Sequence, residues 1–492
     1  MAATASRSSG PARATCSVVA SLDTLPTGLP PGLDGVEVRA DLAGDLPPEE
    51  LARHGVAEVS YSLRSAVEGG RFTGSAEERQ CRLFRAAGRY DVVELEADRD
   101  LTPRLLAAVP PHRRRIAWHG TVSGLAELTA KVRSMSVVPA ALYLLQVRGQ
   151  RVEDGMLPLR LLHRLGRQDV TAFADEAAGW SRFVAPLLGA RTLFAGPFGS
   201  DAYGRTRLAQ LADDYPFFAP GQVEQLYGIV GTSVGGSLSP RLHNAAYRAL
   251  GLPAFYLPFT VPEIGGFWRT VVRRGFAELG LGFRGMTVVS PHKERAVELA
   301  DSVSARVRET RAANLLVRGR SGWRAFTTDP AGVVESLRRK GVSLSGRRVA
   351  VVGCGGAGRG AAAGLVRAGV RPVLVNRGPT RGQWAARLLG LDYLPLGVFD
   401  PGDFGLVVHA TPVREYSPFP VSRMDNGAVV LDMTYGAQET ELVAAARRRG
   451  LGVVDGWDVL TVEVEQQFRL LTRHTMPPSI VEDLRAHAWG LR

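Results

Sequence analysis

Short apolar runs alternate with helix-length segments through the first 220 residues of the chain. Strands that are separated by helical crossovers run parallel to one another. Eight such units in about 200 residues predict an α/β fold in which the sheet closes into a (β/α)8 TIM barrel. The eight candidate strands lie at 15–22, 35–42, 57–64, 90–97, 115–120, 140–147, 168–175 and 191–198.

A Pro/Phe-rich stretch at 213–222 interrupts this pattern and predicts a linker. Beyond it a second α/β run begins, and near residue 350 the composition becomes rich in glycine. The last segment has the pattern of helices, and we expect it to pack back on the earlier domain. The predicted parts are a disordered tail at 1–14, the barrel at 15–222, an α/β domain at 223–330, a nucleotide-binding domain at 331–454 and a helical segment at 455–492.

Composition narrows the functional classes. The 492 residues are 45% hydrophobic, and no apolar run reaches the roughly 18 to 20 residues that cross a bilayer. Three cysteines without paired spacing argue against a disulfide framework or a metal site, and they predict a cytoplasmic protein. The formal charge of +12 comes from arginines scattered over amphipathic helices, so we expect solvated faces that favour anionic substrates rather than a nucleic-acid surface.

A glycine-rich loop follows an apolar strand in the predicted nucleotide-binding domain. Gly353, Gly355 and Gly358 have the G-x-G-x-x-G spacing, and an alanine-rich helix comes next. This spacing between a strand and a helix predicts a dinucleotide site, because the glycines let the backbone approach a pyrophosphate. The following strand ends in Asn376 and Arg377, where an NAD site usually has an acidic residue. With Arg381 one helical turn on, the arginines favour the 2′-phosphate of NADP.

Lysine is rare in this chain and occurs at only three positions, 131, 293 and 340. Lys293 ends the apolar stretch TVVSPHK. A dehydrogenase that reduces a ketone must give a proton to the developing alkoxide, which arginine cannot do. Lysine can do so when partial burial lowers its pKa, and a carboxylate can orient it. We therefore expect Lys293 and Asp329 to be the catalytic pair.

These motifs together resemble the shikimate dehydrogenase family. The matching stretches run in order from YGIVGTSVGGSLSP through GMTVVSPHKE, AANLLV, FTTD, GCGGAGR, VNRGPTR, HATPV and LDMTYGAQETEL to DGWDVLTVEVEQQF, over residues 226 to about 472. The resemblance implies that Ser237 and Ser239 hold the substrate carboxylate, and that Asn314 and Tyr435 help to hold the substrate. It also implies that Gly356 and Ala357 in the loop, and Thr411, belong to the cofactor site.

The chain departs from this family at several expected substrate positions. The usual Asn before the lysine is Thr287, the usual Thr is Val289, and the Asn of the N-T-D segment is Thr327. A late substrate-binding Gln is Glu463, which introduces a charge. These changes either leave shikimate binding intact or shift the preference toward quinate or an amino-bearing analogue.

The N-terminal half resembles type I 3-dehydroquinate dehydratases in the segments VEVRADL, SLRSAVEGGRF, VVELEA and WSRF. By this resemblance Glu37, Arg39, Arg64 and Arg182 would bind the substrate. His119 and Glu96 would form the general acid/base pair. The barrel end at which most of these side chains collect is the active-site face of such folds.

The dehydratase chemistry also needs a lysine on the sixth strand, whose amine forms an imine with the substrate. The equivalent position resembles Tyr143, and the barrel's one lysine, Lys131, falls in a helical segment that we expect to face solvent. In the segment expected to close over the substrate, Arg205 stands where the family has Gln. We therefore expect the imine route to be lost, which leaves a barrel that is structural, regulatory or binds a related ligand.

The resulting prediction is an NADP-dependent shikimate dehydrogenase fused to a degenerate dehydratase barrel, acting on a small cyclic hydroxy acid. Three alternatives stay open. Both halves could work, the dehydrogenase could be of the quinate type, or the chain could be a ligand-sensing pseudoenzyme. No nucleic-acid, membrane or metal partner is expected, and the sequence leaves the oligomeric state open.

Overall fold

The structure is a computed structural model that describes residues 16–26, 28–29, 33–195, 215, 223–436 and 438–482. The predicted tail, most of the predicted linker and Arg205 lie outside these residues. The chain forms two compact units, Met1–Gln225 with Arg269–Gly282, and Leu226–Trp268 with Phe283–Arg492. The predicted division of the second unit near residue 331 stays a prediction.

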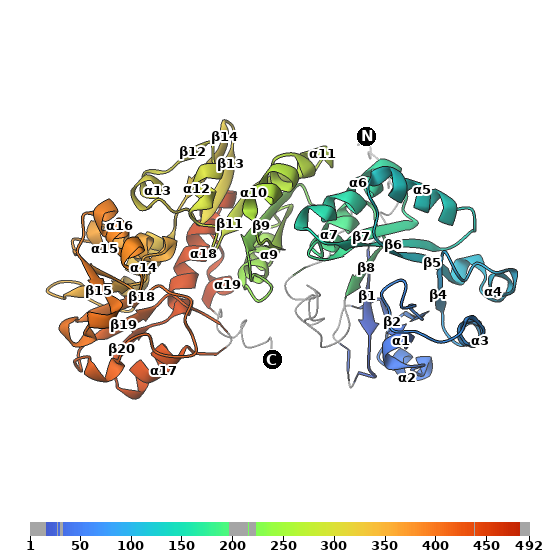
Figure 1. Cartoon of the computed structure of the whole chain (residues 1–492), viewed down its shortest axis with the longest axis horizontal. Helices are drawn as coiled ribbons and strands as arrows, with labels where there is room; N and C mark the ends of the chain where they lie inside the picture. Colours follow the sequence, from blue (N-terminus) through green and yellow to red (C-terminus); the bar gives the residue numbers. More distant parts are fainter. Residues whose placement is uncertain are drawn as a thin grey trace, which may run out of the picture. The chain divides into compact units, whose positions relative to one another are not determined.

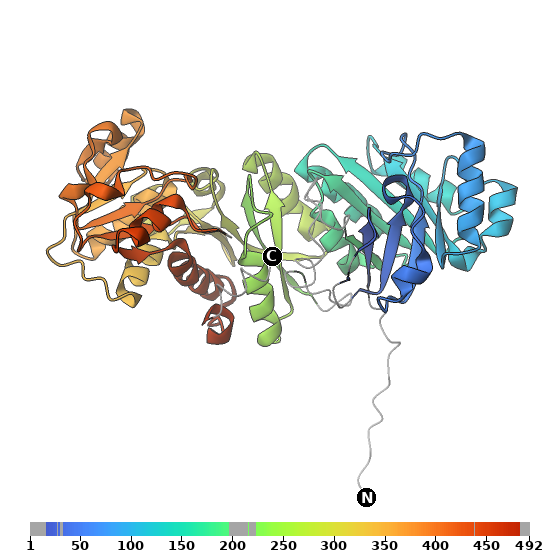
Figure 2. The same ribbon diagram turned by 90° about the horizontal axis from the view of Figure 1, so that it is seen from below.

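The first unit contains one eight-stranded parallel sheet that curves round with helices on its outer side (Figures 1 and 2). Its strand order is β7-β6-β5-β4-β3-β2-β1-β8. All eight predicted strands are present: β1 (Ser17–Leu22), β2 (Gly35–Arg39), β3 (Glu58–Ser62), β4 (Val92–Glu96), β5 (Arg114–Gly120), β6 (Leu142–Gly149), β7 (Val170–Glu176) and β8 (Thr192–Ala195).

The sheet is nearly closed. No ladder joins β7 to β8 among the described residues, but the rings of Phe173 on β7 and Phe194 on β8 lie 6.3 Å apart. Both rings pack inside with Val19, Ala117 and Leu144 from other strands. The structure confirms one part of the barrel prediction, namely an eight-stranded, barrel-like parallel sheet.

Short amphipathic helices connect these strands. In α3 the Ser75 hydroxyl accepts a hydrogen bond from the Glu78 amide at the N-terminus, and Leu83 and Ala86 are among its buried residues. The helical elements of this unit are α1 (Ala40–Ala43), α2 (Pro48–Ala52), α3 (Ala76–Ala87), α4 (Pro103–Ala108), η1 (Pro111–Arg113), α5 (Leu125–Met135), η2 (Val152–Gly155), α6 (Met156–Leu165), α7 (Ser181–Val184), η3 (Ala185–Leu188), most of the π-helix η5 (Trp268–Gly275) and α11 (Phe276–Glu278).

The second unit begins with a mixed sheet of order β10-β9-β11-β13-β14-β12. The sequence pattern missed β12 and β14, which are short or carry an alternating, half-exposed pattern. The elements are β9 (Gln225–Gly231), α9 (Ser239–Ala249), β10 (Ala254–Thr260), α10 (Ile264–Phe267), β11 (Gly282–Val288), α12 (Arg295–Leu299), β12 (Ser302–Val303), α13 (Ala305–Thr310), β13 (Leu315–Gly319) and β14 (Gly322–Phe326).

A parallel sheet of order β17-β16-β15-β18-β19-β20 follows, which is the strand order of dinucleotide-binding folds. Its central strand β15 is the run VAVV, buried on both faces. The elements are α14 (Asp329–Arg339), β15 (Val349–Val352), α15 (Gly356–Arg367), β16 (Val373–Asn376), α16 (Pro379–Leu389), β17 (Tyr393–Pro395), η6 (Leu396–Val398), η7 (Pro401–Asp403), β18 (Leu406–His409), η8 (Val421–Arg423), β19 (Val429–Asp432), α17 (Glu441–Arg448) and β20 (Gly452–Val454).

Two helices end the described chain, α18 (Gly456–Thr472) and α19 (Pro478–Glu482). Asp455 and Asp458 cap the start of α18 reciprocally. Leu460, Val464 and Phe468 of α18 pack with residues of β9 and α9 in one core cluster. The same helix also contacts α14. It therefore packs against elements that lie next to each of the two sheets. Within the described part of the chain, no helix is long and apolar enough to span a membrane.

Candidate active site

Lys293 and Asp329 form an ion pair in the second unit. Lys293 lies in the turn after β11, and Asp329 is the first residue of α14. The Lys293 Nζ is 2.7 Å from Asp329 Oδ1, and the Asp329 side chain is buried. Burial acts to lower the pKa of Lys293, but the Asp329 and Glu463 carboxylates outweigh it and raise the pKa. The expected lowering of this pKa is therefore wrong.

Asp329 is held on both carboxylate oxygens. The Asn314 amide donates to Oδ1 at 3.1 Å, and the Thr327 hydroxyl donates to Oδ2 at 3.2 Å. Asn314 also receives a hydrogen bond from the Thr328 amide at 2.9 Å. These contacts fix the carboxylate that faces Lys293, as the predicted proton-transfer role of the pair requires.

The other predicted substrate residues come from loops next to this pair. Ser239 starts α9, and its amide donates to the Ser237 hydroxyl at 3.2 Å. The Ser237 hydroxyl also contacts the Tyr435 side chain, which sits close enough to Lys293 for their charges to interact. The structure therefore brings Ser237 and Tyr435 to the same site as Lys293.

A buried chain of hydrogen bonds leads from Thr287 toward the Lys293 and Asp329 ion pair. The Tyr256 hydroxyl donates to Thr287 Oγ1 at 2.7 Å, and Thr287 donates to Gln467 Oε1 at 3.0 Å. Gln467 Nε2 in turn donates to Thr328 at 3.2 Å. The sequence interpretation missed Tyr256 and Gln467, although the four-residue spacing of Gln467 from Glu463 on α18 is a signal that both lie on one helix face.

Glu463 lies next to the Lys293 and Asp329 ion pair. Its side chain is half-buried, packs over Gly332 and shares a hydrogen bond with Asp329. Burial and the Asp329 charge raise the pKa of Glu463 to about 8, against the lowering effect of Lys293. Two carboxyl groups in contact disfavour a second negative charge, which adds to the effect of burial on Glu463.

The glycine loop joins β15 to α15 as predicted. Gly353 has φ of 109°, and a Cβ on Gly358 would lie 1.8 Å from the Gly353 carbonyl oxygen, so both positions require glycine. A Cβ on Gly355 would meet nothing within 4 Å, while one on Gly356 would lie 3.1 Å from the Lys293 Cβ. The N-terminus of α15 therefore opens beside Lys293, with Ala357 in its first turn.

The remaining predicted cofactor residues surround this loop. Asn376 accepts a hydrogen bond from the Cys354 amide at 3.2 Å, and a Cβ on Gly353 would lie 2.8 Å from Thr411 Cγ2. Arg377 is exposed at the end of β16. Arg381 pairs with Glu294, which also binds Arg359. Arg381 is thus linked through Glu294 to Arg359 of α15.

Comparisons with known proteins fall on this unit. The model of the shikimate dehydrogenase substrate binding domain matches residues 229–316. Over 248 residues the chain is 36% identical to the shikimate dehydrogenase (NADP(+)) of Syntrophobacter fumaroxidans, covering 49% of this chain and 84% of that protein. The chain belongs to the shikimate dehydrogenase family. The family assignment rests on the C-terminal half alone.

Other family members match a similar share of the chain. The shikimate dehydrogenase (NADP(+)) of Thermococcus kodakarensis is 35% identical over 257 residues, which cover 50% of this chain and 91% of that protein. A crystal structure of shikimate 5-dehydrogenase from Thermus thermophilus, in complex with NADP(H) and shikimate, is 30% identical with a TM-score of 0.48. It covers 54% of this chain and 99% of that chain.

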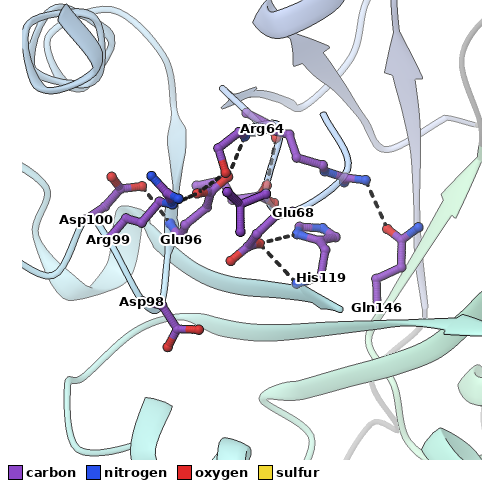
Figure 3. Close-up of polar contacts among 12 residues, drawn as sticks. Arg64, Glu68, Glu96, Asp98, Arg99, Asp100, His119 and Gln146 are labelled. Atoms are coloured by element: carbon purple, nitrogen blue, oxygen red, sulfur yellow. Dashed lines mark hydrogen bonds and ion pairs between the residues drawn. The ribbon is translucent and has the colours of Figure 1, made fainter. Parts of the chain in front are cut away.

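In the barrel-like unit of this shikimate dehydrogenase homologue, His119 contacts Glu68 (Figure 3). The His119 Nδ1 and its backbone amide lie 2.8 Å and 3.0 Å from the same Glu68 oxygen. Burial and the nearby Glu96 and Glu94 raise the pKa of Glu68 to about 9. The structure thus gives His119 a contact with Glu68, and the predicted acid/base role of His119 with Glu96 stays a prediction. The sequence signal for Glu68 is its place in the EGG segment beside Arg64.

Glu96, the last residue of β4, instead ties this strand to the loop after β3 and to α3. It accepts hydrogen bonds from the Ser65 amide at 2.6 Å and the Ser65 hydroxyl at 2.8 Å, and it lies 3.4 Å from Arg79. Ser65 and Arg79 are buried with it. Its partners give Glu96 a structural place beside the Glu68 and His119 pair.

A second polar chain crosses the barrel interior. Gln146 accepts from Arg64 at 3.3 Å and donates to Asp175 at 2.5 Å, and Asp175 pairs with Arg182 at 2.7 Å. All four side chains are at most one-tenth exposed. Arg64 and Arg182, two of the three arginines that were predicted to bind substrate, thus contact the barrel's own groups.

The remaining two barrel candidates are also paired. The buried Arg115, which the sequence interpretation missed, bridges Glu37 to Glu94, and the Ser21 hydroxyl donates to Glu37 at 2.9 Å. Arg39 forms a two-pronged ion pair with Asp41 at 2.8 Å. The polar interior of this unit is therefore neutralised largely by its own residues.

Strand β6 faces the interior with Leu144 and Gln146, so the equivalence of Tyr143 to the missing lysine is wrong. Tyr143 points the other way, where its hydroxyl donates to the Val138 carbonyl and its ring lies under Arg167. In the parallel pairing of β5 with β6, Gln146 is the register partner of His119. Lys131 binds Asp98 at 3.0 Å and lies over Trp118, away from this interior.

Proposed function

We propose that the second unit is an NADP-dependent shikimate dehydrogenase, which interconverts 3-dehydroshikimate and shikimate. The observation that carries the proposal is the Lys293 and Asp329 pair at 2.7 Å, beside the glycine loop of a dinucleotide fold. Its relatives in the family are named shikimate dehydrogenases (NADP(+)).

Proton transfer falls to Lys293 in this proposal. When a ketone is reduced, Nζ donates a proton to the oxygen that becomes the alkoxide, and Asp329 accepts a hydrogen bond that keeps Nζ aimed. Because its neighbours raise its pKa, Lys293 stays protonated at neutral pH and is ready to act as the acid. Ser237, Ser239, Asn314 and Tyr435 would hold the substrate around this pair.

The residues of the glycine loop fit NADP. Gly355 leaves open space, the backbone at Gly353 and Gly358 admits no side chain, and the N-terminus of α15 favours a phosphate charge. Arg377 and Arg381 would bind the 2′-phosphate, with Asn376 and Thr411 shaping the loop. NADP, when bound, would supply or accept the hydride.

The test is NADP reduction by the purified protein with shikimate, beside quinate and beside a Lys293→Ala variant. We expect shikimate turnover that collapses in the variant. Turnover of quinate alone would favour the quinate-type alternative. Tight NADPH binding without turnover of either compound would contradict the proposal and favour a sensor.

The barrel-like unit is, in the same proposal, a dehydratase relative that no longer forms an imine. The support is that β6 presents Gln146, the register partner of His119, where an imine-forming amine would be needed. An amide is not a nucleophile that condenses with a ketone. Borohydride treatment in the presence of 3-dehydroquinate should leave the protein mass unchanged. A trapped adduct would favour the fully bifunctional alternative. The cytoplasmic location stays a prediction.

A further inference from the structure

Helix α18 adds a charged residue to the catalytic pair. Glu463 and Gln467 are four residues apart and therefore lie on one face of the helix. Gln467 reaches Thr287 and Thr328, and Glu463 reaches Asp329. The helix is anchored by its Asp455 cap and by Phe468 in the core, so this face has little freedom to turn away.

The charged and titratable groups around Glu463 come from three elements. Asp329 comes from α14, Lys293 from the turn after β11, and Tyr435 from the segment after β19. Lys293 and Asp329 neutralise each other at 2.7 Å. An ionised Glu463 therefore leaves the site with one uncompensated negative charge, whereas the glutamine expected at this position would leave none.

Shikimate is a poor match for that extra charge. It is itself an anion, and in the proposed site the serine hydroxyls that would hold its carboxylate bring no positive charge. Glu463 is half-buried, so its charge is only partly screened by water. Two arrangements avoid an unpaired negative charge at Glu463. Either Glu463 stays protonated when the ligand binds, or the ligand places a cation next to the ionised carboxylate.

We propose that Glu463 is a specificity-determining residue that selects a cyclic hydroxy acid with an ammonium group in place of one ring hydroxyl. This inference rests on the proposed dehydrogenase function and names its substrate class. The ammonium group forms an ion pair with Glu463, while Lys293 and Asp329 remain available for the hydroxyl that is oxidised. The carboxylate of the ligand stays with Ser237 and Ser239.

The experiment compares shikimate with its two analogues that carry an amino group at one of the hydroxyls that are not oxidised. The kcat/KM of each is measured with NADP at pH 8.5, above the pKa of about 8 of Glu463, for the wild type and for Glu463→Gln. We expect the wild type to prefer one amino analogue at least about 10-fold, and the variant to lose that preference by a factor of about 10 to 100. A wild-type preference for shikimate that Glu463→Gln leaves within twofold would overturn the inference.

Glu465→Gln is the matched control. Glu465 lies two residues along the same helix and pairs with Arg339 at 2.7 Å, away from the catalytic pair. The substitution should leave the substrate ratio unchanged.

If the protein turns over none of these ligands, the proposed function is overturned. A binding measurement then tests the inference about Glu463. Isothermal titration with NADPH present would show tighter binding of an amino analogue than of shikimate, lost in Glu463→Gln. Equal binding of both ligands by the two proteins would overturn it.

Discussion

The two halves of the chain carry similar polar residues but use them differently. At the Lys293 and Asp329 pair the buried amide and hydroxyl groups hold one carboxylate and leave the lysine 17% exposed. In the barrel-like sheet, Arg64 and Arg182 are joined through Gln146 and Asp175. The space they line among the described residues is about 10 Å³, room for about one water.

Residue types alone therefore do not make a site. A charged group can act on a ligand when its neighbours orient it but leave part of its hydrogen-bonding capacity for the ligand. When neighbouring groups bind it inside a narrow, buried interior, less of the same group is left for a ligand. Substitutions at the Lys293 and Asp329 pair and substitutions in the barrel interior should therefore each affect their own half of the chain.

The largest expected effect is on the catalytic pair. Lys293→Met should lower kcat with shikimate by about 10³-fold, since a positioned general acid contributes roughly 10² to 10⁴. NADPH binding should be kept, as measured by fluorescence titration. The control is Lys340→Met, whose lysine pairs with Asp458 at 3.1 Å on the surface. A variant of Lys293 with a kcat within tenfold of the wild type would show that the pair is not the proton donor.

A stability effect should mark the barrel interior. Arg115→Met leaves Glu37 and Glu94 buried without their shared cation, which should lower the free energy of unfolding by about 3 to 5 kcal/mol. The thermal transition should shift while dehydrogenase kcat at room temperature stays constant. Arg99→Met, at a half-exposed position, is the control. An unchanged transition for Arg115→Met would mean that the interior is not held by these charges.

A smaller effect belongs to the chain of hydrogen bonds behind the site. Gln467→Ala removes the partner of both Thr287 and Thr328, which costs about 1 to 3 kcal/mol for the groups left unpaired. The KM for the substrate should rise about tenfold with a smaller change in kcat. Gln466→Ala, on the neighbouring face of α18, should change neither. Equal effects of the two substitutions would assign Gln467 to general helix stability.

The smallest expected effect is a pH dependence. The pKa of Glu463 is raised to about 8, so the group is protonated below that pH and becomes negative above it. The kcat/KM for shikimate should therefore fall as the pH rises through about 8, because the ionised carboxylate repels the anionic substrate. A pH series with Glu463→Gln should lack this fall. A fall of equal size in the variant would assign it to another group.

Much of this could be predicted from the sequence, for identifiable reasons. Strand runs such as VAVV and the spacing of Gly353, Gly355 and Gly358 are local patterns, so the strands of the barrel-like sheet and the dinucleotide loop followed from them. Lys293 stood out because lysine is otherwise so rare in this chain.

The contacts that the sequence could not supply are between residues distant along the chain. Gln467 meets Thr287 across 180 positions, and Arg115 meets Glu37 across 78. Which of Glu68 and Glu96 faces His119, and which side of β6 faces inward, depend on strand register and loop geometry. A one-residue shift in register reverses the answer for Tyr143 and Gln146.

NADPH oxidation by the purified full chain, measured in parallel with 3-dehydroshikimate and with 3-dehydroquinate, tests the central comparison most directly. A working dehydrogenase half beside a barrel without dehydratase activity predicts rapid oxidation with 3-dehydroshikimate and none with 3-dehydroquinate. Oxidation at comparable rates with both compounds would contradict the account, because it requires either an active barrel that converts the second compound into the first or a dehydrogenase that reduces both.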